Sequence, residues 1–477
     1  MKKQWIIRLV CFLLLLQSPG LYAQKAIQKE LDNYCSDKNF QHAQVSVCVR
    51  DVSSNNILAS VNGEKSMTPA SIVKLYTSAA ALAYLGDDFR FKTVLGYTGT
   101  IEKNGTLNGD IVVVGGGDPT MGSKFFPSTK SFIDTITKAV LDAGITKIKG
   151  HVVIDCSIYK DDKESIPSTW LFDDFGKDYA AGVFPVSYQD NIFQISIKTG
   201  EKGEVAEVND TTQNVSIDGT TGDSTLLLHS NVDDQLVKIT GYIPPNRNEY
   251  VVRSAMPSPP DVLGMELHMA FFRKGLVQYT HEYKISKKNI SSIKVLKEIY
   301  SPQLQYIVAI MNYYSSNNYA EHLVKYLAYT QKGSGTFLNG ALCVMAYMKT
   351  LGVETSGLSL FDGSGLSRTD ISNANHMSEF LVKEYNKVGG KESSFYKSLP
   401  TSGRSGTLRS FPFPPTLVDK VHAKTGSMSG IRNLAGYMET KSGKTVAFCL
   451  MFNGCFDTDY QMKEKEAKML EMIYNNY

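Results

Sequence analysis

Residues 68–86 read TPASIVKLYTSAAALAYLG, and this stretch decides the fold. Thr68 is a candidate N-cap and Pro69 suits the first position of a helix, so a helix is predicted to begin here. After Lys74 the stretch carries no charged residue. A helix that is apolar all round is a buried helix. The pattern therefore places Ser71 on the first turn of a central helix, with Lys74 one turn later on the same face.

A serine three residues before a lysine is weak evidence by itself, because this spacing arises by chance in long chains. Two further short segments follow it, Ser315-Ser316-Asn317 and Lys424-Thr425-Gly426. Together the three segments supply a serine nucleophile, a lysine beside it, a second serine, an amide and a second lysine. Their order and spacing predict an enzyme that acylates a serine without using a histidine.

Ser71 is the predicted nucleophile. A serine hydroxyl attacks poorly unless a base is within reach. Lys74 can be that base if burial and a nearby cation such as Lys424 keep it neutral. The N–H groups of Ser71 and Ser427 are the candidate donors for the developing oxyanion.

The second segment has two interpretations. Ser315 is predicted to relay a proton between Lys74 and the leaving amine, and Asn317 to hold Lys74 and a substrate amide. The alternative is that these residues only cap a helix, since Ser and Asn are frequent N-caps.

The third segment is predicted to bind the substrate. Lys424 and Thr425 suit a terminal carboxylate through charge-assisted hydrogen bonds. Gly426 lets a substrate backbone approach the edge of a strand. The alternative is an ordinary turn at the start of a strand.

The amino-acid composition and the predicted secondary structure change twice along the chain. Short strand-like runs rich in Gly, Thr, Val and Asp fill residues 91–290, whereas helical patterns dominate afterwards. The first and second segments are 315 − 71 = 244 residues apart, far more than a simple connection needs. The sequence therefore predicts an α/β (α+β) protein. One domain, with a helical part and an antiparallel sheet, is formed by residues 24–90 and 291–477, and a β-rich insert of two small domains interrupts it.

Residues 1–23 have the pattern of a secretory signal. A positively charged start is followed by an apolar run, Leu9–Leu16, and Ala23 suits cleavage. A membrane-spanning helix needs about 20 apolar residues, so an uncleaved membrane anchor is the less favoured alternative. The pattern predicts an exported protein that is soluble or attached only peripherally.

Composition excludes several classes of function. The formal charge of 50 − 47 = +3 falls to zero without the signal segment, which gives no support for nucleic-acid binding. The cysteines show no Cys-x-x-Cys spacing and the histidines no metal-binding spacing, so no metal or cofactor is predicted. Export permits disulfides, and the sequence leaves their pairing open. Cys48, Cys343 and Cys449 lie in apolar runs, where a buried free thiol is expected.

With these segments in place, the chain resembles the low-molecular-mass class C penicillin-binding proteins, the D-alanyl-D-alanine carboxypeptidases and endopeptidases of bacterial cell walls. The resemblance covers nearly all of the mature chain. It is carried by Pro69–Leu75, Gly115–Thr120, Ser315–Asn317 with Ala320-Glu321, Asp362–Arg368, Gly406–Leu408, Lys424–Gly426 and Leu434–Tyr437. Ser316 replaces the more usual Asp of this family, and we expect that side chain to point away from the site.

The resemblance implies a serine β-lactamase/DD-peptidase-like transpeptidase domain with β-rich inserted domains. It implies peptidoglycan stem peptides as substrates and β-lactams as covalent inhibitors, with Lys424 on the substrate carboxylate. It also implies that Ser364, Arg368 and Met428 lie near the pocket for the side chain of the donor peptide. An arginine there suits a carboxylate such as that of diaminopimelate. The oligomeric state is left open.

Two other functions use the same segments. A β-lactamase or esterase would need a deacylating base, and the sequence offers no clear Glu for it. A non-hydrolytic wall-binding sensor would not need all three segments intact.

Overall fold

The computed structural model describes residues 19–36, 38–159, 164–210, 214–222, 225–231, 236–280 and 282–477. The predicted signal segment, 1–23, lies outside the described residues up to position 18, and helix α2 (Pro19–Cys35) includes the rest. None of the helices in these ranges combines the length and the apolar character that crossing a membrane requires.

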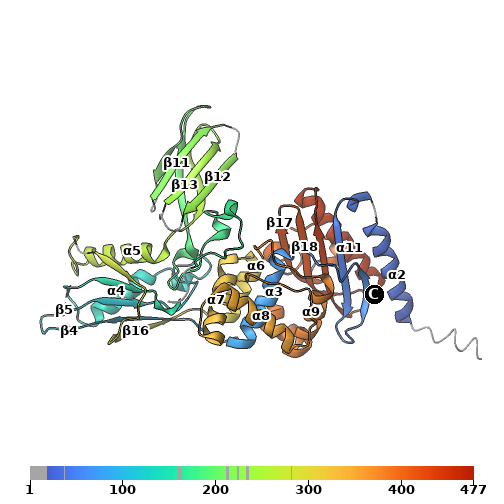
Figure 1. The fold of residues 1–477 in the computed structure, drawn as a ribbon, viewed down its shortest axis with the longest axis horizontal. Helices are drawn as coiled ribbons and strands as arrows, with labels where there is room; N and C mark the ends of the chain where they lie inside the picture. Colours follow the sequence, from blue (N-terminus) through green and yellow to red (C-terminus); the bar gives the residue numbers. More distant parts are fainter. Residues whose placement is uncertain are drawn as a thin grey trace, which may run out of the picture.

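Both ends of the chain share one five-stranded antiparallel sheet (Figure 1). Strand β1 pairs along its whole length with β19, so the start of the chain is hydrogen-bonded to its last strand. The strand order is β17 (Val421–Met428), β18 (Ile431–Glu439), β19 (Thr445–Asn453), β1 (Gln44–Asp51) and β2 (Ile57–Val61).

The two faces of this sheet bury different cores, because alternate side chains of a strand point to opposite faces. In β1, Val47 and Val49 pack with α2 and α11 (Asp459–Asn476), whereas Cys48 packs with the helices on the other face, including α9 (Ala374–Val388). Cys48, Cys343 and Cys449 are buried free thiols, which confirms that prediction.

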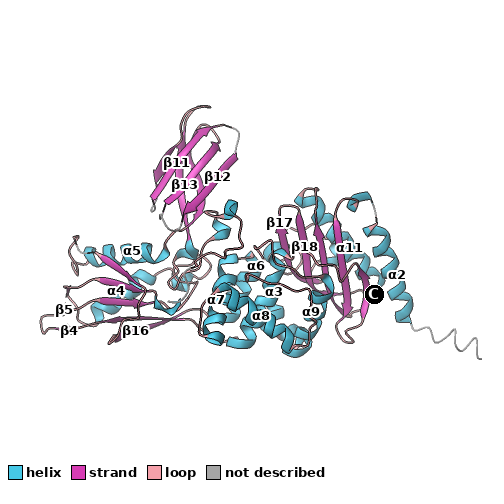
Figure 2. Ribbon diagram, in the orientation of Figure 1, coloured by secondary structure: helices cyan, strands magenta, loops and turns pink. Residues whose placement is uncertain are grey.

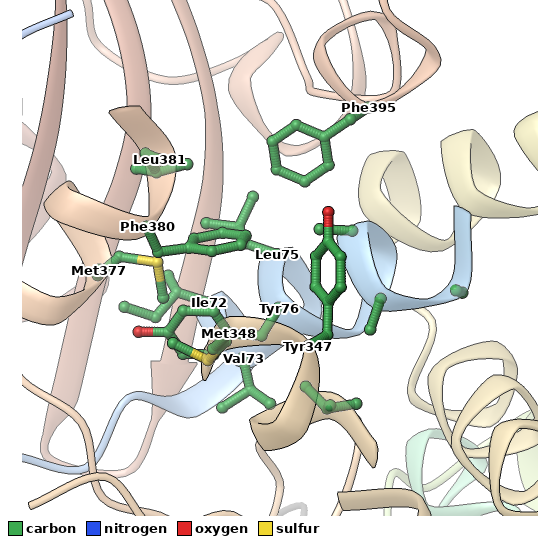
Figure 3. Close-up of a cluster of buried hydrophobic side chains, with 14 of the residues drawn as sticks. Ile72, Val73, Leu75, Tyr76, Tyr347, Met348, Met377, Phe380, Leu381 and Phe395 are labelled. Carbon is green, nitrogen blue, oxygen red and sulfur yellow. The ribbon is translucent and has the colours of Figure 1, made fainter. Parts of the chain in front are cut away.

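The central helix is α3 (Val73–Leu85), preceded by a 3-10 turn, Ala70–Ile72. From Val73 to Leu82 every residue of this helix is buried, as the sequence predicts. Figure 3 shows Tyr76 of α3 beside Phe380, whose ring centroid lies 4.8 Å from that of Tyr76 in an edge-on contact. The helix that carries the predicted base is therefore fixed from all sides.

Thr68 does not cap this helix, so that prediction was wrong. Pro69 occupies the N-cap position and no side chain caps the turn. Instead, Asn433 Nδ2 on β18 donates to the carbonyl oxygens of Thr68 (3.1 Å) and Pro69 (2.7 Å). A side chain of the sheet thus holds the turn by its backbone carbonyls, and the turn needs no side-chain cap.

Further helices surround α3 (Figure 2). Helix α6 ends at Tyr314 with Ser315 as its C-cap, and α7 begins directly after Ser316. The second predicted segment is therefore the junction between two helices packed on α3. The bounds are α6 (Leu304–Tyr314), α7 (Asn317–Lys332), α8 (Phe337–Thr350) and α10 (Ser394–Lys397).

The part of the chain between α3 and α6 is built on a five-stranded mixed sheet. Its order is β15 (Tyr283–Ser286), β8 (Val152–Asp155), β6 (Ile111–Val114), β3 (Lys92–Tyr97) and β16 (Lys294–Tyr300). Helices α4 (Phe132–Asp142) and α5 (Pro259–Arg273) pack with this region, and the sequence did not predict either of them.

Smaller three-stranded sheets complete this region. They are β10 (Glu207–Asp210), β9 (Ile192–Thr199) and β14 (Arg247–Ala255); β11 (Asn214–Thr221), β13 (Leu236–Ile243) and β12 (Thr225–Asn231); and β4 (Thr100–Ile101), β5 (Thr106–Asn108) and β7 (Lys147–Ile148).

The α/β (α+β) class is confirmed, with a helical part against an antiparallel sheet and further β sheets between the two halves of that part. The domain limits 24–90, 291–477 and 91–290 stay predictions. Strand β16 begins at Lys294 and pairs with β3, so the mixed sheet extends beyond residue 290.

Candidate active site

Lys74 is the centre of the site. Its side chain is fully buried, and Nζ donates to Ser71 Oγ (2.9 Å), Asn317 Oδ1 (2.6 Å) and the Ser364 carbonyl oxygen (2.7 Å). Ser71 and Lys74 meet because residues three apart lie on one face of a helical turn. The arrangement joins the predicted nucleophile, base and amide in one hydrogen-bonded group.

Burial sets the protonation of Lys74. It lowers the pKa of this amine to about 7, although the carboxylates of Asp362, Glu321 and Asp370 oppose the shift. Burial also lowers the pKa of Lys424 well below its ordinary value, and the neighbouring Lys74 adds to that effect. A substantial fraction of Lys74 is therefore neutral near pH 7, as a general base requires.

The turn that carries Ser71 is tightly constrained. Ala70 has φ +49°, a conformation that non-glycine residues rarely adopt and that persists only when the surroundings impose it. A Cβ on Gly426 would lie 2.9 Å from the Pro69 carbonyl oxygen and 3.2 Å from the Ser71 nitrogen. Strand β17 thus needs glycine here because the nucleophile's own backbone lies against it.

The junction between α6 and α7 presents Ser315. This residue ends α6 in the left-handed region with φ +56°, and its hydroxyl accepts from Lys424 Nζ at 2.8 Å. Among the described residues, that hydroxyl makes no hydrogen bond with Lys74. Ser316 Oγ caps α7 by accepting from the Tyr319 nitrogen, so the middle residue faces the helix, as expected.

The third segment lies within strand β17. Lys424 is fully buried and Nζ also donates to the Thr425 carbonyl oxygen at 2.7 Å, while Thr425 Oγ1 donates to Thr407 Oγ1 at 3.0 Å. Ser427 is exposed and Met428 is half-buried at the end of the strand. The structure places this strand against the turn of Ser71, and the substrate-binding roles of these residues stay predictions.

Buried carboxylates shape the loop that supplies Ser364. Glu321 Oε1 and Oε2 accept from the Gly363 nitrogen (3.1 and 3.0 Å), and Oε1 also accepts from the Ser364 nitrogen (2.7 Å). Asp362 accepts from the Gly365 nitrogen at 2.6 Å and the Ser367 nitrogen at 2.7 Å. The two acids hold the loop so that the Ser364 carbonyl faces Lys74.

Ser364 and Arg368 have different surroundings. The Ser364 side chain is fully buried and its hydroxyl lies 3.4 Å from Asp362, so its contact with the site is through its carbonyl. Arg368 is exposed, four residues after Ser364. Ser364 therefore contributes a carbonyl oxygen to the site, and the role of Arg368 stays a prediction.

Two residues of the intervening region reach the site, and the sequence analysis missed both. The Tyr179 carbonyl oxygen accepts from Asn317 Nδ2 at 2.9 Å, and Trp170 Nε1 donates to Asp362 Oδ2 at 2.8 Å. A backbone carbonyl leaves no signal in the sequence, and a single tryptophan offers no pattern. Among the described residues, no three or more His, Cys, Asp or Glu side chains are arranged to hold a metal.

The fold and this geometry define a serine acyl-transfer enzyme of the penicillin-binding type. The family model described as D-Ala-D-Ala carboxypeptidase 3 (S13) matches residues 27–475. The chain belongs to this family and is a serine-type D-alanyl-D-alanine carboxypeptidase.

Relatives agree with that assignment. A D-alanyl-D-alanine carboxypeptidase from Actinomadura sp. (strain R39) is 27% identical over 451 residues, covering 90% of this chain and 81% of its own. The D-alanyl-D-alanine carboxypeptidase DacB of Haemophilus influenzae is 26% identical over 447 residues, covering 91% of this chain and 90% of DacB. The crystal structure of penicillin binding protein 4 (dacB) from Haemophilus influenzae has a similar fold, with a TM-score of 0.82 at 24% identity. The match covers 93% of this chain and 99% of that structure.

The rate of acylation by a β-lactam should depend on pH through Lys74. Because the pKa of Lys74 is lowered to about 7, the amine is neutral above that pH and protonated below it. We expect the second-order rate constant to fall about tenfold for each pH unit below 7 and to level off above it. Stopped acylation reactions with a fluorescent penicillin, followed from pH 5 to 9, measure this profile. A rate constant that stays flat from pH 5 to 7 would contradict a base with this pKa.

Proposed function

We propose that this enzyme hydrolyses the bond between the two terminal D-alanines of peptidoglycan stem peptides through an acyl-enzyme on Ser71. The observation that carries the proposal is the 2.9 Å contact between Ser71 Oγ and the buried Lys74 amine. Ser71 Oγ attacks the carbonyl carbon, and its proton passes to Lys74. The N–H groups of Ser71 and Ser427 stabilise the oxyanion. The C–N bond breaks, the second D-alanine leaves, and water hydrolyses the ester.

Ser315 and Lys424 would help the leaving group to depart. The Ser315 hydroxyl accepts from Lys424, so its own proton would pass to the departing amine. The proton that Lys74 took from Ser71 would then be relayed to Ser315, which returns both groups to their starting forms. Lys424 and Thr425 would also donate hydrogen bonds to the terminal carboxylate of the substrate, whose negative charge would raise the lowered pKa of Lys424. Asn317 has both polar atoms engaged, with Lys74 and with the Tyr179 carbonyl, so its role is to hold the base.

The same site would accept β-lactams as slow substrates and D-amino-acid crosslinks as endopeptidase substrates. A true β-lactamase would need a free carboxylate to activate the deacylating water. Glu321 is the buried glutamate near Lys74, but its oxygens accept from the Gly363 and Ser364 nitrogens. This arrangement favours a peptidase, in which the acyl-enzyme formed with penicillin persists.

We assign the enzyme to the periplasm, where its proposed substrate is found. The signal pattern of residues 1–23 and the family both support export.

Intact-mass analysis tests the nucleophile. The chain from residue 24, incubated with benzylpenicillin, should gain the mass of one penicilloyl group and should release D-alanine from a pentapeptide ending in D-Ala-D-Ala. Ser71→Ala should lose the adduct and at least about a thousandfold of the peptidase activity, because Ser71 is the hydroxyl that the Lys74 amine contacts. An adduct retained by Ser71→Ala would refute the assignment, and an adduct without alanine release would favour an endopeptidase or a sensor.

Arg368 is our candidate for recognising the side chain of the donor peptide. It is exposed in the loop that supplies the Ser364 carbonyl, and a guanidinium binds a carboxylate through two parallel hydrogen bonds. Arg368→Ala should lower kcat/KM about tenfold for a stem peptide with a free side-chain carboxylate and leave an amidated peptide unchanged. Arg404→Ala, at another exposed arginine, is the matched control. Equal losses on both peptides would contradict this role.

A further inference from the structure

Residues 164–191, which we call the strap, run from the intervening region onto helix α7. Successive turns of α7 are bonded to it. The contacts are Asn318 Nδ2 with the Gly182 carbonyl (3.2 Å), Tyr319 Oη with Asp190 Oδ1 (2.9 Å), His322 Nε2 with Ser187 Oγ (2.6 Å) and Lys325 Nζ with the Glu164 carbonyl (2.6 Å). Since α7 begins at Asn317, the strap is fixed to the element that supplies one partner of Lys74.

Two contacts of the strap converge on Lys74. In the first, the Tyr179 carbonyl accepts from Asn317 Nδ2, while Asn317 Oδ1 accepts from Lys74. In the second, Trp170 donates to Asp362, which also accepts from the backbone nitrogens that follow Ser364 in the loop. The Ser364 carbonyl is the other acceptor for Lys74. Each acceptor other than Ser71 is thus held by the strap.

These acceptors decide whether Lys74 can take a proton from Ser71. A neutral amine has two N–H donors and one lone pair. If the two N–H groups point at Asn317 Oδ1 and the Ser364 carbonyl, the lone pair is left facing Ser71 Oγ, 2.9 Å away. Loss of either acceptor would let the amine rotate and turn an N–H toward the serine.

Trp170 is a buried part of this arrangement. Its side chain is 5% exposed and Asp362 is 1% exposed, so water offers little replacement for the bond between them. When a buried carboxylate loses a donor, the unmade hydrogen bond raises the free energy of the folded state. The surrounding backbone then shifts to reduce that free-energy cost. The backbone that would shift here is the loop carrying the Ser364 carbonyl.

We propose that Trp170 is a positioning residue for the catalytic base, acting through Asp362 and the Ser364 carbonyl to orient Lys74. The region inserted between the first and second segments therefore takes part in acylation although it supplies none of the reacting groups. This inference rests on the proposed role of Lys74 as the base.

The tryptophan content of the chain permits a test at a single atom. The sequence has two tryptophans, Trp5 in the signal segment and Trp170, so a chain from residue 24 carries Trp170 alone. Global replacement of tryptophan by β-(benzothien-3-yl)alanine puts sulfur in place of the indole N–H and keeps the ring. Trp170→Phe removes the same N–H genetically, together with part of the buried ring. Tyr188→Phe, which removes the bond from another buried strap residue to Glu266, is the matched control.

The readout is benzylpenicillin acylation at rising drug concentrations, which separates the limiting rate constant from the concentration at half-saturation. We expect both Trp170 replacements to lower the limiting rate constant about tenfold, with half-saturation within about twofold of wild type, and Tyr188→Phe to change neither. A limiting rate constant within twofold of the control, or a change confined to half-saturation, would overturn the proposal. If the unmodified chain were not acylated at all, the proposed function would be at fault instead.

Discussion

The burial of one amine constrains most of this structure. Lys74 lies on a helix that is enclosed on every face, where a charged side chain is costly and a neutral one still needs hydrogen-bond partners. Its partners come from three places in the chain: the turn of Ser71, the start of α7 at Asn317, and the loop at Ser364. The fold must bring these segments within 3 Å of one nitrogen, and the same burial lowers the pKa of that nitrogen to about 7.

The second lysine shows the same principle from the side of the sheet. Lys424 is also buried, beside Lys74, and two like charges in such a place are disfavoured. Strand β17 can carry it to this position because Gly426 lets the strand lie against the backbone of the Ser71 turn, while Asn433 of β18 fixes that turn. The close approach of strand β17 to the Ser71 turn thus sets the second lysine beside Lys74.

The sequence predicted the features that side-chain chemistry marks directly. An uncharged stretch after Lys74 indicated a buried helix, and the structure has the buried helix α3 there. It failed where backbone atoms decide. The Thr68 cap is replaced by contacts from Asn433 to two carbonyls, and Ser364 acts through a carbonyl while its side chain is buried. Neither arrangement leaves a residue pattern to detect.

The strap was hidden for the same reason. Tyr179 contributes a carbonyl, and Trp170 meets Asp362 across 192 positions of sequence. Helices α4 and α5 were missed because they lie within a region whose composition favours turns and short strands. What the sequence could supply was the identity of the polar groups, and what it lacked was which of them meet.

The titration of Lys74 tests the central claim most directly. Nuclear magnetic resonance of a chain with isotope-labelled lysine side chains, followed from pH 5 to 11, reports the pKa of each amine. We predict a resonance that titrates near pH 7 and disappears in Lys74→Ala, in keeping with the lowered pKa of this buried amine. If every lysine resonance lost in that variant titrated above about pH 9, close to the ordinary range of lysine, Lys74 would be a cation at neutral pH and the proposed mechanism would be wrong.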